Sequence, residues 1–201
     1  MPAPLVHPHH PLPCRSWSAH LFRVHRVEDG PVWFGARRRL HRFDDPVGAF
    51  GVLYAGADPV VAYLETVRNA VRPGGPRIAV VDESHLRARA TTTLQPRRAL
   101  RLVDLVDHQA AMHVPGEVMA GSPLHRGYTD AQAWSRALHD HPDGIDGILY
   151  RARHDLSRRA VALFDRVGVE SLEVVETWRF DGDWGATLDL IESLGHVLVP
   201  G

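Results

Sequence analysis

The sequence contains no lysine, so all 23 basic residues are arginines. Mechanisms that need a lysine amine, such as Schiff-base chemistry, are therefore excluded. Cysteine is almost as scarce. Cys14 is the only one, which excludes an intrachain disulfide and leaves no partner for a thiolate metal site. A single cysteine fits a reducing compartment, and we expect a cytoplasmic protein.

Long apolar runs and a strong net charge are also missing. No apolar stretch approaches the ~20 residues needed to span a bilayer, and the N-terminus lacks the basic-then-apolar order of a secretion signal. The formal net charge of −1 gives no general attraction to nucleic acid or to an anionic membrane. We therefore expect neither as a partner, and any bound anion must be held by local arginines.

The composition is that of a folded globular protein, with 44% hydrophobic and 23% charged residues, and no break in it suggests two domains. The proline- and histidine-rich start predicts an extended arm over residues 1–20, followed by one domain over residues 21–201. The histidines of the arm could chelate a metal, but a solvated tail explains them as well.

Short apolar or alternating runs predict many strands, and only a few segments are typical of helices. The predicted strands are 21–27, 32–34, 51–55, 77–82, 99–104, 147–150, 160–165 and 170–178. Predicted helices begin near residues 59, 128 and 184, whereas residues 105–125 have no clear period. We expect an α+β fold, a compact mixed domain with a mostly antiparallel β core flanked by a few helices.

The helix that begins near residue 59 has the clearest signals. Asp58 is a favoured N-cap and Pro59 a favoured first helical residue. Val60, Leu64 and Val67 are predicted to form its buried face, with Glu65 at the border of that face. A glutamate placed there can offset positive charge that develops on a sugar ring.

Common catalytic motifs are absent from the sequence. No His-x-x-x-His or Glu-x-x-His pair falls on a predicted helix, so no metal site is predicted. There is no glycine-rich phosphate loop of the Walker or Rossmann type. A Ser-His-Asp site stays open, although no nucleophile-elbow motif is present.

Several short motifs occur in an order that resembles the RES domain family. They are Leu21-Phe22-Arg23-Val24, His41-Arg42-Phe43-Asp44-Asp45-Pro46, Leu53-Tyr54-Ala55, Ala62-Tyr63-Leu64-Glu65, Asp146 to Arg153, and Ala162-Leu163-Phe164-Asp165. The resemblance covers roughly residues 21–177. It implies a fold similar to ADP-ribosyltransferase toxins, and a toxin that destroys NAD+ by phosphorolysis or hydrolysis.

The resemblance also implies which residues act. The family's arginine corresponds to Arg23, its second arginine to Arg42, its strand tyrosine to Tyr54 and its acid to Glu65. Glu65 would steady the ribose, the arginines would bind the diphosphate, and Tyr54 would stack on nicotinamide. NAD+ would then be a substrate, with no cofactor needed and inorganic phosphate as a possible co-substrate.

Two departures from the family pattern concern the loop and the serine. Phe43, Asp44 and Asp45 replace the Trp-Asn-Pro run expected after Arg42, and Ala152 stands where a serine is common. Thr129 is the best replacement hydroxyl, with Ser135 as a weaker one, but the Thr129-x-x-Gln pattern is also that of a helix cap.

Other functions are compatible with the same residues. Taken singly, each arginine, tyrosine or glutamate is more often structural than catalytic. The protein could instead transfer ADP-ribose to another protein, or be an inactive binding module. The resemblance further implies an Xre-type antitoxin as a possible partner, and a homo-oligomer is also possible.

Overall fold

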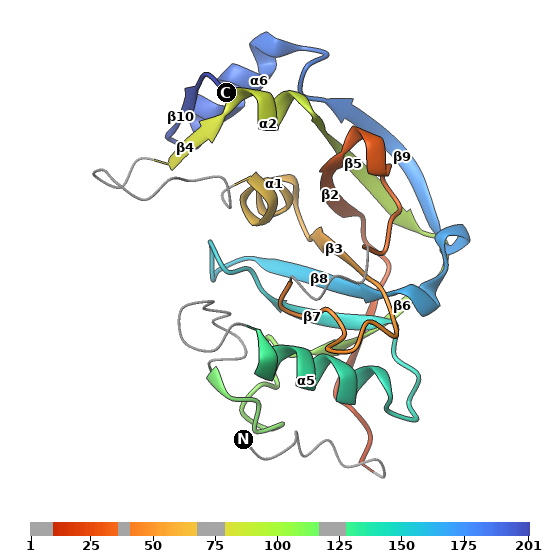
Figure 1. Ribbon diagram of the computed structural model, residues 1–201. Coiled ribbons are helices and arrows are strands. Elements are labelled where there is room, and N and C mark those ends of the chain that lie inside the picture. Colours follow the sequence, from red (N-terminus) through yellow and green to blue (C-terminus); the bar gives the residue numbers. More distant parts are fainter. Residues whose placement is uncertain (1–9, 36–40, 68–78, 117–127) are drawn as a thin grey trace.

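The computed structural model describes residues 10–35, 41–67, 79–116 and 128–201. Its centre is one curled eight-stranded sheet in the order β1-β6-β7-β8-β3-β2-β5-β9, in which only the β6–β7 pair is parallel. A small parallel pair, β10 and β4, lies at the other side of α1 (Figure 1). This arrangement confirms the predicted α+β class and the mostly antiparallel core.

The elements have the following bounds. The strands are β1 Cys14–Trp17, β2 Leu21–Arg26, β3 Val52–Gly56, β4 Ala79–Asp82, β5 Arg89–Pro96, β6 Leu100–Asp104, β7 Gly147–Arg151, β8 Arg159–Phe164, β9 Leu172–Arg179 and β10 His196–Val199. The described helices are α1 Pro59–Val67, α2 Glu83–Arg87, α5 Thr129–His139 and α6 Trp184–Ser193, with short 3-10 turns at Val27–Asp29, Asp165–Val167 and Val169–Ser171.

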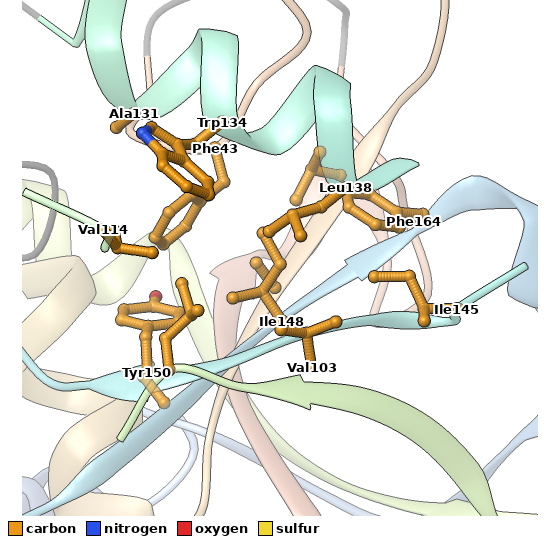
Figure 2. Packing of buried hydrophobic residues seen from close by; sticks show 14 of the residues in the cluster. Phe43, Val103, Val114, Ala131, Trp134, Leu138, Ile145, Ile148, Tyr150 and Phe164 are labelled. Carbon is orange, nitrogen blue, oxygen red and sulfur yellow. The ribbon is translucent and has the colours of Figure 1, made fainter. Parts of the chain in front are cut away.

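The central strands are buried on both faces, which explains their continuous apolar runs. Along β8, Ala160, Ala162 and Phe164 face α5, whereas Val161 and Leu163 face the inside of the curl. Figure 2 shows the α5 side, where Trp134 and Leu138 point from the helix onto the sheet. A third cluster packs α1 against β2, β4, α2 and α6.

Helix α1 begins as predicted, because the Asp58 carboxylate accepts a hydrogen bond from the Val61 amide at 3.0 Å. The predicted buried face was partly wrong. Val61, Ala62, Tyr63 and Val67 are the buried residues, while Val60 and Leu64 are only partly buried. The helix lies between β3 and β8 on one side and the β4–β10 pair on the other (Figure 1). It buries side chains in both directions, since Val61 packs in the α5 cluster and Ala62, Tyr63 and Val67 pack in the third cluster.

Most predicted strands are confirmed, but residues 32–34 do not form one. The neighbouring places beside β2 are taken by β5 and β3, and the Trp33 carbonyl instead accepts a hydrogen bond from Arg23. The strands β1, β5 and β10 and the helix α2 were not predicted. Residues 77 and 78 of the predicted 77–82 strand lie outside the described residues.

Residues 14–17, predicted as part of an extended arm, form the edge strand β1 against β6, and Leu12 packs into the core. The segment that precedes Leu21 therefore contributes to the sheet from Cys14 onward. Among the described helices, none is long and apolar enough to cross a membrane.

Candidate functional site

A cleft opens where the large sheet splits. Strands β2 and β3 are in register only at Phe22 and Gly56, whereas β2 pairs with β5 along its whole length. Beyond Phe22 the two strands diverge, and α1 follows β3 across the gap (Figure 1). The cleft has a volume of about 440 Å³, which lies in the range of small-molecule sites.

The lining of the cleft comes from segments far apart in the sequence. It consists of Phe22, Arg23, Val24, His25, Arg26, Asp29, Trp33, His41, Arg42, Tyr54, Ala55, Ala62, Glu65, Thr66, His85, Arg89, Tyr128, Tyr150, Arg153 and His154. Four of the five predicted site residues, Arg23, Arg42, Tyr54 and Glu65, are therefore brought together.

Glu65 enters the cleft from α1. Its Oε1 accepts hydrogen bonds from the backbone amides of Arg153, at 2.6 Å, and His154, at 3.4 Å. These contacts fix the carboxylate against the loop that follows β7. Its negative charge also contributes, after burial itself, to the raised pKa of the Tyr150 hydroxyl.

Arg23 points into the cleft from β2 and is 9% exposed. Its Nη1 donates to the Trp33 carbonyl at 2.7 Å, and no carboxylate of the described chain lies within ion-pair distance. Burial lowers the pKa of Arg23 to about 10, and Asp29 partly opposes this effect. The side chain is therefore still charged at neutral pH.

Arg42 is also buried, and its guanidinium lies over two aromatic rings. The distances from Cζ to the ring centroids are 5.6 Å for Phe43 and 5.2 Å for Tyr150. Phe43 and Tyr150 in turn contact each other edge to face (Figure 2). Such cation–π contacts stabilise the positive charge of a guanidinium that is buried away from water.

Tyr54 joins β3 to the loop that carries Arg42. Its hydroxyl accepts from the Phe43 amide at 2.9 Å and donates to the Asp44 carboxylate at 3.0 Å. Burial, followed by the charge of Asp44, raises the pKa of Tyr54 well above its ordinary value. Phe43 and Asp44, which depart from the family pattern, thus help to hold the loop that carries Arg42.

Thr129 is not brought into the cleft with the others. It is exposed, and Tyr128, one residue earlier, is the N-cap of α5. The predicted capping box was therefore wrong, and the Gln132 amide donates to the His41 carbonyl instead. Ser135 is fully buried and donates to the Phe43 carbonyl at 2.6 Å, so its hydroxyl supports the loop.

The structure adds residues that the sequence did not single out. Arg153 donates from Nη1 to the Tyr128 hydroxyl at 3.1 Å, which joins the β7 loop to the start of α5. His25 bridges the Arg26 carbonyl and Thr92, and burial, followed by the charge of Arg23, lowers its pKa. Only Arg153 lay in a quoted motif. His25, His85 and Arg89 gave no local signal.

No group of three or more His, Cys, Asp or Glu side chains in the described part of the chain could hold a metal ion. The cleft instead gathers guanidiniums, phenol rings and one glutamate. Arginines suit phosphate groups, and aromatic rings suit flat heterocycles. The protein is thus an α+β domain with a cleft that presents guanidiniums, aromatic rings and one glutamate.

The sequence matches the family described as "RES domain" over residues 20–183. This chain belongs to the RES domain family, as its motifs predicted. A search of curated proteins found no match.

Among solved structures, the chain is similar to one in the crystal structure of the M. tuberculosis MbcT-MbcA toxin-antitoxin complex, with a TM-score of 0.61 and 18% sequence identity. The similarity covers 82% of this chain and 85% of the other. At this identity it supports the fold.

Proposed function

We propose that the protein consumes NAD+ by breaking the bond between nicotinamide and ribose. The observation that carries this proposal is that Glu65 lies in one cleft with Arg23, Arg42 and Tyr54. The RES domain family, to which the chain belongs, supports the same conclusion. In this proposal NAD+ is a substrate and no cofactor is required.

The chemistry needs charge stabilisation more than a protein nucleophile. When the C1′–N bond breaks, its electron pair goes to the nicotinamide ring, and positive charge develops on the ribose. The Glu65 carboxylate offsets that charge, while its two backbone hydrogen bonds hold it in place. An oxygen of inorganic phosphate or of water then bonds to C1′, and the proton of an attacking water passes to solvent.

The arginines and aromatic rings orient the substrate. Arg23 and Arg42 bind the diphosphate, and the Tyr54 ring stacks on nicotinamide. Correct orientation alone can supply several kcal/mol of the barrier reduction. The Tyr54 hydroxyl is already engaged with Phe43 and Asp44, so the ring of this residue, and not its hydroxyl, meets the substrate.

Release of nicotinamide from NAD+ by the pure protein tests the proposal. We expect release in wild type, and a rate lowered about 100-fold in Glu65→Gln, since an oriented electrostatic group contributes about this much. The amide oxygen of Gln can still accept the two backbone hydrogen bonds, so the melting temperature should change little. Parallel assays with inorganic phosphate or without it identify the acceptor.

The matched control is Glu192→Gln, which neutralises an exposed carboxylate on α6. No release by wild type in either buffer, or equal rates for wild type and Glu65→Gln, would contradict the proposal. Transfer of label from NAD+ to a macromolecule in a cell lysate would indicate an ADP-ribosyltransferase instead.

We further propose that the protein acts in the cytoplasm as the toxin of a toxin–antitoxin pair. Family membership supports this role, and so does the similar fold found in a toxin–antitoxin complex. Expression in a bacterial host should lower cellular NAD+ and stop growth, and Glu65→Gln should do neither. An Xre-type antitoxin expressed from a neighbouring gene should restore growth.

A further inference from the structure

The loop that follows β2 carries an exposed tryptophan to the cleft. Val32 and Phe34 pack against the hydrophobic cluster inside the curl of the sheet. Trp33, which lies between them, belongs to none of the hydrophobic clusters of the described residues and is 38% exposed. Because its two neighbours point into the protein, the Trp33 side chain faces outward, and it lines the cleft.

The backbone of this loop is held in place. The Trp33 carbonyl accepts a hydrogen bond from Nη1 of the buried Arg23 at 2.7 Å. The Phe34 carbonyl packs directly on Gly51, where a Cβ atom would overlap with it. A tryptophan side chain has only two torsions, so on a fixed backbone it loses little conformational entropy when a ligand binds. Trp33 is therefore a large apolar surface that is both exposed and already in position for a ligand.

The cleft contains two pairs of an arginine and an aromatic residue, one on each wall. On the wall formed by β3, the Tyr54 hydroxyl binds the Phe43 amide, next to Arg42. On the wall formed by β2 and its loop, Arg23 binds the backbone of Trp33. The two walls separate because β2 and β3 diverge. Each wall thus offers a flat ring together with a cation that can bind phosphate.

Glu65 lies with the first of these pairs. Its charge acts on the Tyr150 hydroxyl, and the centroid of the Tyr150 ring lies 5.2 Å from Cζ of Arg42. In the proposed function Glu65 faces the ribose that carries nicotinamide, so nicotinamide belongs to the wall of Tyr54. The second pair is left for the other half of a dinucleotide.

We propose that Trp33 is a specificity-determining residue whose indole ring stacks on the adenine base of a dinucleotide. Adenine is flat and, like indole, consists of two fused rings, so the two surfaces match in shape and size. That the dinucleotide is NAD+ rests on the proposed function, whereas the stacking surface itself rests on the geometry of the loop.

Titration with ADP-ribose, which contains adenine but no nicotinamide, tests the stacking. Wild type should bind ADP-ribose, and Trp33→Ala should weaken the binding about tenfold, as expected for loss of stacking on one base. Trp33→Phe keeps a ring and should retain most of the affinity. The matched control is Trp184→Phe on α6, whose ring lies under Arg87 and does not line the cleft. It should bind as wild type does.

Tryptophan fluorescence gives a second measurement, which a purely structural role of Trp33 would not change. Adenine that stacks on an indole ring quenches its emission. ADP-ribose should therefore lower the emission of wild type and of Trp184→Phe, but not that of Trp33→Phe. Ribose 5-phosphate, which lacks the base, should leave all three unchanged. This comparison also decides the question if Trp33→Ala does not fold.

Three results would overturn the proposal: no binding of ADP-ribose by wild type, equal affinity of wild type and folded Trp33→Ala, or unchanged emission of wild type at saturating ADP-ribose. Nicotinamide release is not measured in these titrations, so the two proposals can fail separately. Release by a protein whose emission does not respond to ADP-ribose would reject the stacking alone. Binding that depends on Trp33 without any release would support the stacking and reject the proposed activity.

Discussion

The hydroxyl of Tyr54 connects the strand β3 to the loop that carries Arg42. It accepts from the Phe43 amide and donates to Asp44, so a single oxygen holds two consecutive residues of that loop. The ring of Tyr54 lines the cleft and contacts the ring of His41, with 5.5 Å between the two ring centroids. One residue therefore both shapes the binding surface and secures its border.

Replacing Tyr54 by Phe should separate these two contributions. The ring remains, but the Phe43 amide loses its acceptor, so the free energy of unfolding should fall by about 1–3 kcal/mol. The loosened loop should raise the KM for NAD+ severalfold and change kcat less. Urea unfolding and steady-state kinetics measure the two effects.

The control for this prediction is Tyr63→Phe. The Tyr63 hydroxyl is hydrogen-bonded to Nδ1 of His196, between α1 and β10 and outside the cleft. This variant should lose some stability and keep the wild-type KM. An unchanged KM in Tyr54→Phe would show that the loop needs no tie to β3.

At the scale of elements, helix α5 supports the loop that carries Arg42. Its Ser135 hydroxyl donates to the Phe43 carbonyl, and its Gln132 amide donates to the His41 carbonyl. Its Arg136 forms an ion pair with the buried Asp45 at 3.0 Å. Polar side chains on successive turns of one helix thus hold the loop around Arg42.

Ser135→Ala should lower the free energy of unfolding by about 1–2 kcal/mol, because a buried carbonyl loses its donor. Ser193→Ala is the matched control. Its hydroxyl also donates to a backbone carbonyl, that of Leu190, but within its own helix and at an exposed position on α6. Thermal or urea unfolding should separate the two variants clearly. Equal losses would mean that the Ser135 hydrogen bond contributes no more than an exposed one.

The strands that were predicted from sequence are those with strong apolar runs. Strands β3, β7 and β8 are buried on both faces, so each is a continuous apolar run. Such a run predicts a strand even when its neighbours in the sheet are unknown. Strand β5 was missed because Thr91-Thr92-Thr93 at its centre form neither an apolar run nor an apolar–polar alternation, although threonine itself is common in strands. Its pairing with β2 and β9 places these β-branched residues, and such long-range pairing leaves a weak local signal.

The residues of the candidate site also differ in whether the sequence alone predicts them. Glu65 and Tyr54 lie on elements with clear local signals, and Arg23 and Arg42 followed from the family motifs. Arg89 and His85 reach the cleft only because β5 pairs with β2 and α2 packs beside it. Tertiary packing therefore decides which arginines face the ligand, and spacing along the chain does not reveal it.

At the scale of the whole molecule, buried carboxylates join distant parts of the sheet. Asp146 accepts hydrogen bonds from both terminal nitrogens of Arg98, at 2.6 and 2.7 Å, and from the Arg101 backbone amide, at 2.8 Å. Asp104 accepts from Arg15 of β1 at 2.6 Å. Burial opposes ionisation of both carboxyls, but these hydrogen bonds prevail and lower the pKa of each below its ordinary value.

The pH dependence of stability follows from the direction of these shifts. A carboxyl whose pKa is lower in the folded protein stabilises the fold at pH values above its unfolded pKa, near 3.9, and loses that contribution as the pH falls through the folded value. The free energy of unfolding should therefore decline as the pH drops below about 4.

Asp146→Asn should make this decline shallower and lower the stability at pH 7 by about 2 kcal/mol, because Arg98 loses a charged acceptor. Asp189→Asn, at an exposed position on α6, should follow the wild-type curve. Urea unfolding between pH 3 and pH 7 measures all three proteins. If Asp146→Asn kept the wild-type slope, the acid sensitivity of the sheet would have to arise elsewhere, with the Arg15–Asp104 pair as the next candidate.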